Sequence, residues 1–155
     1  MRAYEPRAVP WLSVVFGYGP MLPFVAGAVL VWVLRGPTAE AVFTLTLLWA
    51  CAILLFLSGV RRGVSFRTEG GATLAQIATM LSLFLLGYGA VIAFARGEPA
   101  IALGLLIVGF TEIAILDPIA ARRGEVPLYF ERLRPAQIPL AVLSLAALLA
   151  YRLTL

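Results

Sequence analysis

Two acidic residues lie within or at the end of a long apolar run, where ionisable side chains are unusual: Glu112 and Asp117. A charge near the centre of a membrane costs about 3 kcal/mol, so Glu112 is expected to face other protein groups or to stay protonated. A helical rise of about 1.5 Å per residue puts Tyr18, Thr79 and Ser82 at a similar depth. We therefore predict a polar cluster of Glu112 with Tyr18 and with Thr79 or Ser82. Such a cluster could relay protons or bind a quinone or lipid headgroup; alternatively, a protonated Glu112 only joins helices.

Asp117 lies near the predicted end of its helix, level with Arg61 and Arg62 at the end of another. The arginine fork binds a carboxylate bidentately, so we predict an ion pair between Asp117 and one of these arginines. A second interpretation is that Arg61, Arg62, Arg122 and Arg123 form a rim for the phosphates of anionic lipids. A third is that these side chains only extend to the membrane surface and set the topology.

The segment 127–135 mixes aromatic residues with arginines, notably Tyr129, Phe130, Arg132 and Arg134. This mixture is typical of a short helix that lies in the plane of a membrane interface. We expect such a helix before the last span, with Pro135 as the point of return into the membrane. Its alternative role is a docking site for a protein partner.

The composition offers little for catalysis. The chain has no histidine and no lysine, and Cys51 is its only cysteine. No serine with a plausible base, no phosphate-binding glycine loop and no cluster of metal ligands is present. We therefore predict a protein that is not an enzyme and has neither a metal nor a cofactor. The net charge of +4 does not predict nucleic-acid binding, because the arginines are dispersed between apolar runs.

Those apolar runs determine the fold class. The chain is 62% hydrophobic and only 13% charged, whereas soluble domains carry about 25% charged residues. Five runs are each long enough to cross a bilayer core of about 30 Å. The sequence predicts a single all-α transmembrane domain over residues 1–155, with five spans at about 10–34, 39–57, 72–94, 100–116 and 136–153.

The first run contains an unusual concentration of helix-breaking residues: Gly17, Gly19, Pro20 and Pro23. Proline removes a helical hydrogen bond and kinks a helix. In a membrane, the freed carbonyls need donors from neighbouring elements or water. The break predicts either a ligand site near Tyr18 or a kink that lets helices pack.

The distribution of arginines predicts the orientation. Every basic residue is an arginine, and nine of the twelve fall on the side that holds the N-terminus, whereas three fall on the other. The positive-inside rule then puts the N-terminus in the cytoplasm and the C-terminus outside. An alternative is that residues 1–28 form a cleaved signal peptide, with Arg2 and Arg7 as its basic end. The continuation of the apolar run to Leu34 argues against it.

Three segments resemble a family of small membrane proteins, and they are the ranges 17–24, 56–63 and 116–134. They read GYGPMLPF, FLSGVRRG, and LDP followed by ARRG, PLYF and LR. With this spacing the chain resembles the domain-of-unknown-function 3429 family, which includes transmembrane protein 69. The family pattern has tryptophan where this chain has Arg62, and Trp-Tyr where it has Tyr129-Phe130. The resemblance implies a multi-pass inner-membrane protein and no particular activity.

The sequence thus favours a non-catalytic accessory or assembly subunit of a larger membrane complex, respiratory or photosynthetic, or a protein that associates with itself. Its expected partners are membrane lipids, with anionic headgroups on the cytoplasmic side, and other membrane subunits. The alternative is a carrier for a small molecule, quinone or lipid that uses Glu112 and the arginine rim. Exclusive use of arginine favours a GC-rich bacterial genome, hence the bacterial inner membrane.

Overall fold

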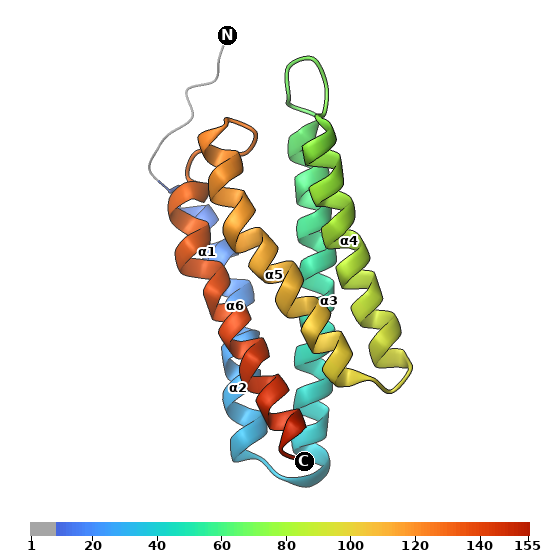
Figure 1. Ribbon diagram of the computed structural model, residues 1–155. Coiled ribbons are helices and arrows are strands. Elements are labelled where there is room, and N and C mark those ends of the chain that lie inside the picture. The colour runs from blue at the N-terminus through green and yellow to red at the C-terminus, as the bar shows by residue number, and fades with distance from the viewer. Residues whose placement is uncertain (1–8) are drawn as a thin grey trace.

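The computed structural model describes residues 9–155, and every regular element in that range is helical. Figure 1 shows these elements as a bundle of long helices. Their bounds are α1 Trp11–Tyr18, the 3-10 turn η1 Gly19–Met21, α2 Leu22–Val33, α3 Gly36–Ser65, α4 Leu74–Ala95, α5 Pro99–Arg122 and α6 Phe130–Leu153. Five segments are long and apolar enough to cross a membrane: Trp11–Val33 as one broken helix, and α3, α4, α5 and α6. The chain is therefore a multi-pass membrane protein by length and composition.

Successive spans run in opposite directions and pack mainly against their chain neighbours. α3 packs on α4, α4 on α5 and α5 on α6, and α2 closes the bundle against α3 and α6 (Figure 1). One end of the bundle holds the start of α1, the end of α3, the α4 start, the α5 end and the start of α6. We call it the arginine end, because it carries Arg61, Arg62, Arg67, Arg122, Arg123, Arg132 and Arg134. The opposite end carries Arg35, Arg96 and Arg152.

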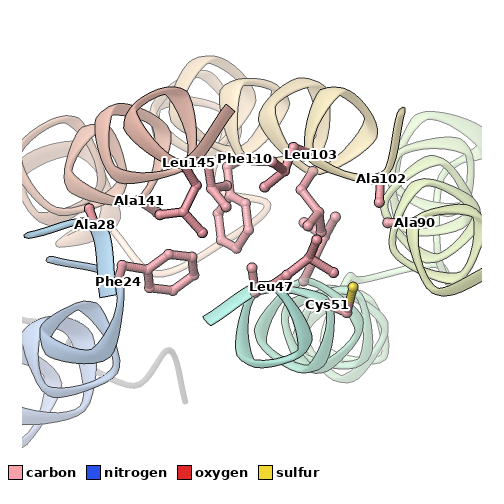
Figure 2. Close-up of a cluster of buried hydrophobic side chains, with 14 of the residues drawn as sticks. Phe24, Ala28, Leu47, Cys51, Ala90, Ala102, Leu103, Phe110, Ala141 and Leu145 are labelled. Atoms are coloured by element: carbon pink, nitrogen blue, oxygen red, sulfur yellow. The ribbon is translucent and has the colours of Figure 1, made fainter. Parts of the chain in front are cut away.

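The hydrophobic core is formed by side chains of α2, α3, α4, α5 and α6 (Figure 2). Phe24 of α2 meets Phe110 of α5 edge to face, with ring centroids 5.3 Å apart. α2 and α3 approach so closely at Gly27 that a Cβ atom there would lie 2.0 Å from the Thr46 hydroxyl oxygen. Small residues at such points let the backbones of membrane helices come together.

The helices extend beyond the apolar runs at the arginine end. α3 continues about two turns past Leu57 to Ser65, and α5 continues past Leu116 and through Pro118 to Arg122. A helix can outlast its apolar stretch because the backbone hydrogen bonds do not require apolar side chains. These extensions position the polar residues described below.

The last helix differs from its predicted bounds. Residues 130–134 are the first part of α6 rather than a separate short helix, and α6 passes through Pro135 and Pro139. Proline at 135 removes the helical donor for the carbonyl of Glu131, a residue at the exposed start of the helix. Water can satisfy that carbonyl, so Pro135 does not end the helix.

Candidate functional site

The extended ends of α3 and α5 bring together Arg61 and Asp117. Arg61 Nη2 donates to Asp117 Oδ1 at 2.5 Å. Both residues are buried, with exposed fractions of 9% for Arg61 and 3% for Asp117. This is the pairing between the ends of the second and fourth spans that the sequence predicts.

Asp117 has a second arginine partner, which the sequence analysis missed. Arg134 Nε of α6 lies 3.0 Å from Asp117 Oδ2, within ion-pair distance but without hydrogen-bond alignment. Its guanidinium also stacks over the Phe130 ring, 4.4 Å from the ring centroid. Pro135 predicts a boundary between an interfacial helix and the last span, and that boundary would leave Arg134 outside the bundle. The available signal was the spacing of Arg134 and Gln137, which puts both on one face of a helix that continues through the proline.

The polar contacts continue from Arg134 toward the break in the first span. Arg134 Nη1 donates to Gln137 Oε1 at 3.2 Å, and Gln137 Nε2 donates to the carbonyl of Gly17 at 2.7 Å. We call Arg61, Asp117, Arg134, Gln137 and the Gly17 carbonyl the buried polar chain. It connects α3, α5, α6 and α1.

The break itself is stabilised by side chains from two neighbouring helices. Prolines at 20 and 23 interrupt the helical hydrogen bonds, and η1 separates α1 from α2. Gln137 donates to the Gly17 carbonyl, and Trp49 Nε1 of α3 donates to the Pro20 carbonyl at 3.0 Å. The predicted kink is therefore present, and α3 and α6 supply donors to its carbonyls.

A cavity of about 140 Å³ lies beside the buried polar chain, and we call it the arginine-end cavity. It is bounded by α1, η1, α3 and the start of α6. Its lining residues are mostly apolar: Ser13, Phe16, Gly17, Pro20, Met21, Ile53, Phe56, Leu57, Val60, Tyr129, Phe130, Leu133, Arg134 and Gln137. Arg134 and Gln137 thus belong both to the polar chain and to the wall of the cavity. A second cavity of about 10 Å³ shares Arg134 with it and reaches Arg61 and Asp117.

The other arginines of the predicted rim lie outside this network. Arg62 Nη1 donates to Ser65 Oγ at 3.1 Å and its guanidinium lies over the Phe66 ring. Arg122 forms an exposed ion pair with Glu131 at 2.7 Å. Arg123 is also exposed. The rim therefore divides into one buried member, Arg61, and an outer group.

The residues of the predicted interfacial segment also divide into members that pack in the bundle and members that are exposed. The rings of Tyr129 and Phe130 meet edge to face at 5.2 Å, and both residues line the arginine-end cavity. Arg132 is exposed, whereas Arg134 is buried.

The predicted cluster around Glu112 forms only in part. Ser82 Oγ of α4 donates to Glu112 Oε2 of α5 at 2.8 Å. Thr79 instead donates to the Ala75 carbonyl of its own helix. Tyr18 belongs to α1, which packs against η1 and α6 rather than forming one of the main contacts of α4. The sequence indicates the depth of these residues along the membrane normal, but not the order of the helices around the bundle. The Glu112–Ser82 pair joins α4 to α5, and both residues are partly exposed.

Comparisons with known protein families, with curated proteins and with solved structures gave no match for this chain.

Proposed function

We propose that this chain is a non-catalytic protein of the bacterial inner membrane and serves as an accessory subunit of a larger membrane complex. The observation that supports this most directly is the Glu112–Ser82 pair between α4 and α5, which the bundle buries only in part. A carboxyl group near the middle of a span is expected to face protein, because lipid tails offer no hydrogen-bond partners. Since the chain covers Glu112 only in part, a helix of another subunit is the missing cover.

The low burial of α4 points to the same helix as a contact for a partner. Only 17% of the most apolar window of α4 is buried within the bundle, compared with 33–44% in the other four spans. α4 also presents a stacked aromatic pair, Phe84 and Tyr88, and both residues are exposed. Tyr88 lies on a different face of α4 from Ser82, because six helical residues turn about 240°, and its hydroxyl is a further polar group that a partner can bind on this helix.

The proposed orientation has the arginine end in the cytoplasm, with the N-terminus inside. Seven arginines within residues 9–155 lie at that end and three at the other. This asymmetry is the one that the positive-inside rule expects for short loops. In this orientation, the turn at 124–129 and the exposed side chains of Arg122 and Arg132 lie at the cytoplasmic interface, next to anionic headgroups.

A photo-crosslinking residue tests the proposed partner surface directly. We would place it at Leu85 of α4, which is 63% exposed, and at Leu143 of α6, which is 68% exposed, as the matched control. We expect a protein adduct of one defined mass from position 85 in intact cells, a weaker or absent adduct from position 143, and loss of the adduct when Glu112→Leu is added. Lipid adducts alone at both positions would contradict the proposal. An adduct of two copies of this chain would replace the larger complex with self-association.

A further inference from the structure

The buried polar chain has an imbalance of charge. Arg61 and Arg134 are both within 4.0 Å of Asp117, and within residues 9–155 neither forms an ion pair with a second acid. Two guanidinium groups therefore share one carboxylate in a buried setting. Within the same residues, Arg61 Nε has no hydrogen-bond partner. An uncompensated charge away from water is unfavourable, so this arrangement favours an additional anion.

The arginine-end cavity has the shape and chemistry to bring that anion from the membrane. Its walls are apolar along α1 and α3, where Phe16 and Phe56 are exposed at the bundle surface. Its inner end presents Arg134 and Gln137, which are 6% and 3% exposed. A cavity with an apolar entrance and a cationic end matches a molecule with an apolar chain and an acidic headgroup.

We propose that the arginine-end cavity binds an anionic amphiphile, with an acidic phosphate at Arg134 and Gln137 and an apolar chain between α1 and α3. The guanidinium fork suits phosphate oxygens, and it strengthens each hydrogen bond by its charge. Gln137 uses one amide N–H for the Gly17 carbonyl, which leaves a second N–H for the ligand. With the phosphate bound, two anions, the phosphate and the Asp117 carboxylate, balance the charges of Arg61 and Arg134.

This site is independent of the partner surface proposed above. It lies between α1, α3 and α6, whereas the Glu112–Ser82 pair lies on α4 and α5. Failure of one proposal therefore leaves the other unchanged.

Native mass spectrometry of the full-length protein in a neutral detergent measures lipid binding one molecule at a time. We would titrate phosphatidylglycerol against phosphatidylcholine with the same acyl chains. Both lipids carry a phosphate, but the choline ammonium of phosphatidylcholine cancels its charge and would lie beside two arginines. We therefore expect one phosphatidylglycerol to bind at least about tenfold more tightly than phosphatidylcholine. Equal binding of the two lipids would overturn the proposal.

Three variants distinguish the contribution of the lipid headgroup to binding from that of the acyl chain. Arg134→Gln is expected to abolish the preference for phosphatidylglycerol, and it leaves Arg61 and Asp117 as a neutral pair that keeps the bundle folded. Ile53→Trp fills the apolar part of the cavity and is expected to weaken binding while retaining both arginines. Arg122→Gln removes an exposed arginine at the same end of the bundle and is the matched control, expected to bind as the wild type does. If Arg134→Gln fails to fold, the test rests on Ile53→Trp: weaker lipid binding supports the cavity as the site, and unchanged binding contradicts it.

The source of the phosphate is tested by competition. We expect inorganic phosphate not to displace bound phosphatidylglycerol, because it lacks the apolar chain. Full displacement by inorganic phosphate would contradict an amphiphile site. A loss of preference in Arg122→Gln equal to that in Arg134→Gln would show general attraction of anionic lipid to the arginine end, and would also contradict it.

Discussion

Asp117 and Glu112 lie five residues apart on α5, but their carboxyl groups differ in burial and in bonding partners. Asp117 is 3% exposed and lies between two arginines that come from α3 and α6. Glu112 is partly exposed and accepts one hydrogen bond, from a serine hydroxyl of α4. The comparison shows that the bonding partners and the burial of a carboxyl group depend on which helices lie next to it more than on its depth in the membrane. Asp117 joins three helices of the bundle, whereas Glu112 joins only α5 to α4 and stays partly exposed.

The largest effect is expected from Asp117→Asn. It removes the single carboxylate between Arg61 and Arg134, so two buried positive charges face each other without compensation. Breaking a buried ion pair in this way costs about 3–5 kcal/mol. The measurement is the free energy of unfolding in detergent micelles. Glu131→Gln, which breaks the exposed pair with Arg122, is the control and is expected to cost less than about 1 kcal/mol. Equal losses in the two variants would show that burial of the Asp117 pair is unimportant.

A smaller effect is expected from Gln137→Leu, which tests whether the buried polar chain extends beyond the ion pairs. The variant removes the side-chain donor of the Gly17 carbonyl and one acceptor of Arg134. Leaving such buried groups unsatisfied costs about 1–3 kcal/mol. The same unfolding measurement checks it. Wild-type stability in this variant would mean that the break between α1 and α2 does not depend on α6.

The smallest effect is expected from Ser82→Ala on the α4–α5 surface. A single hydrogen bond between membrane helices contributes about 0.6 kcal/mol, so a loss of that size in unfolding free energy is expected. Thr79→Val is the matched control, because the Thr79 hydroxyl bonds within its own helix and joins nothing to α5. A loss above about 2 kcal/mol in Ser82→Ala would place this pair among the contacts that hold the bundle together.

Much of this organisation could be predicted from the sequence, because it depends on local composition. Long apolar runs predict the five membrane-length helices, and the glycines and prolines of the first run predict its break. The Arg61–Asp117 pair could also be predicted, since both residues fall at the same level at the ends of predicted spans.

The remaining features depend on how helices rotate and which ones are neighbours. Arg134 joins Asp117 only because α6 begins before Pro135 and turns that side chain inward. Tyr18 was expected beside Glu112 because their depths agree, yet α1 packs against α6. Hydropathy gives the depth of a residue along a span and does not give the direction in which its side chain points.

The most direct test is the unfolding free energy of Glu112→Gln, measured beside Asp117→Asn in the same detergent. The substitution keeps the size of the side chain and an acceptor for Ser82, so the isolated protein is expected to lose no more than about 1 kcal/mol, several-fold less than Asp117→Asn loses. A loss in Glu112→Gln as large as that in Asp117→Asn would contradict the division of roles between the two carboxyl groups of α5.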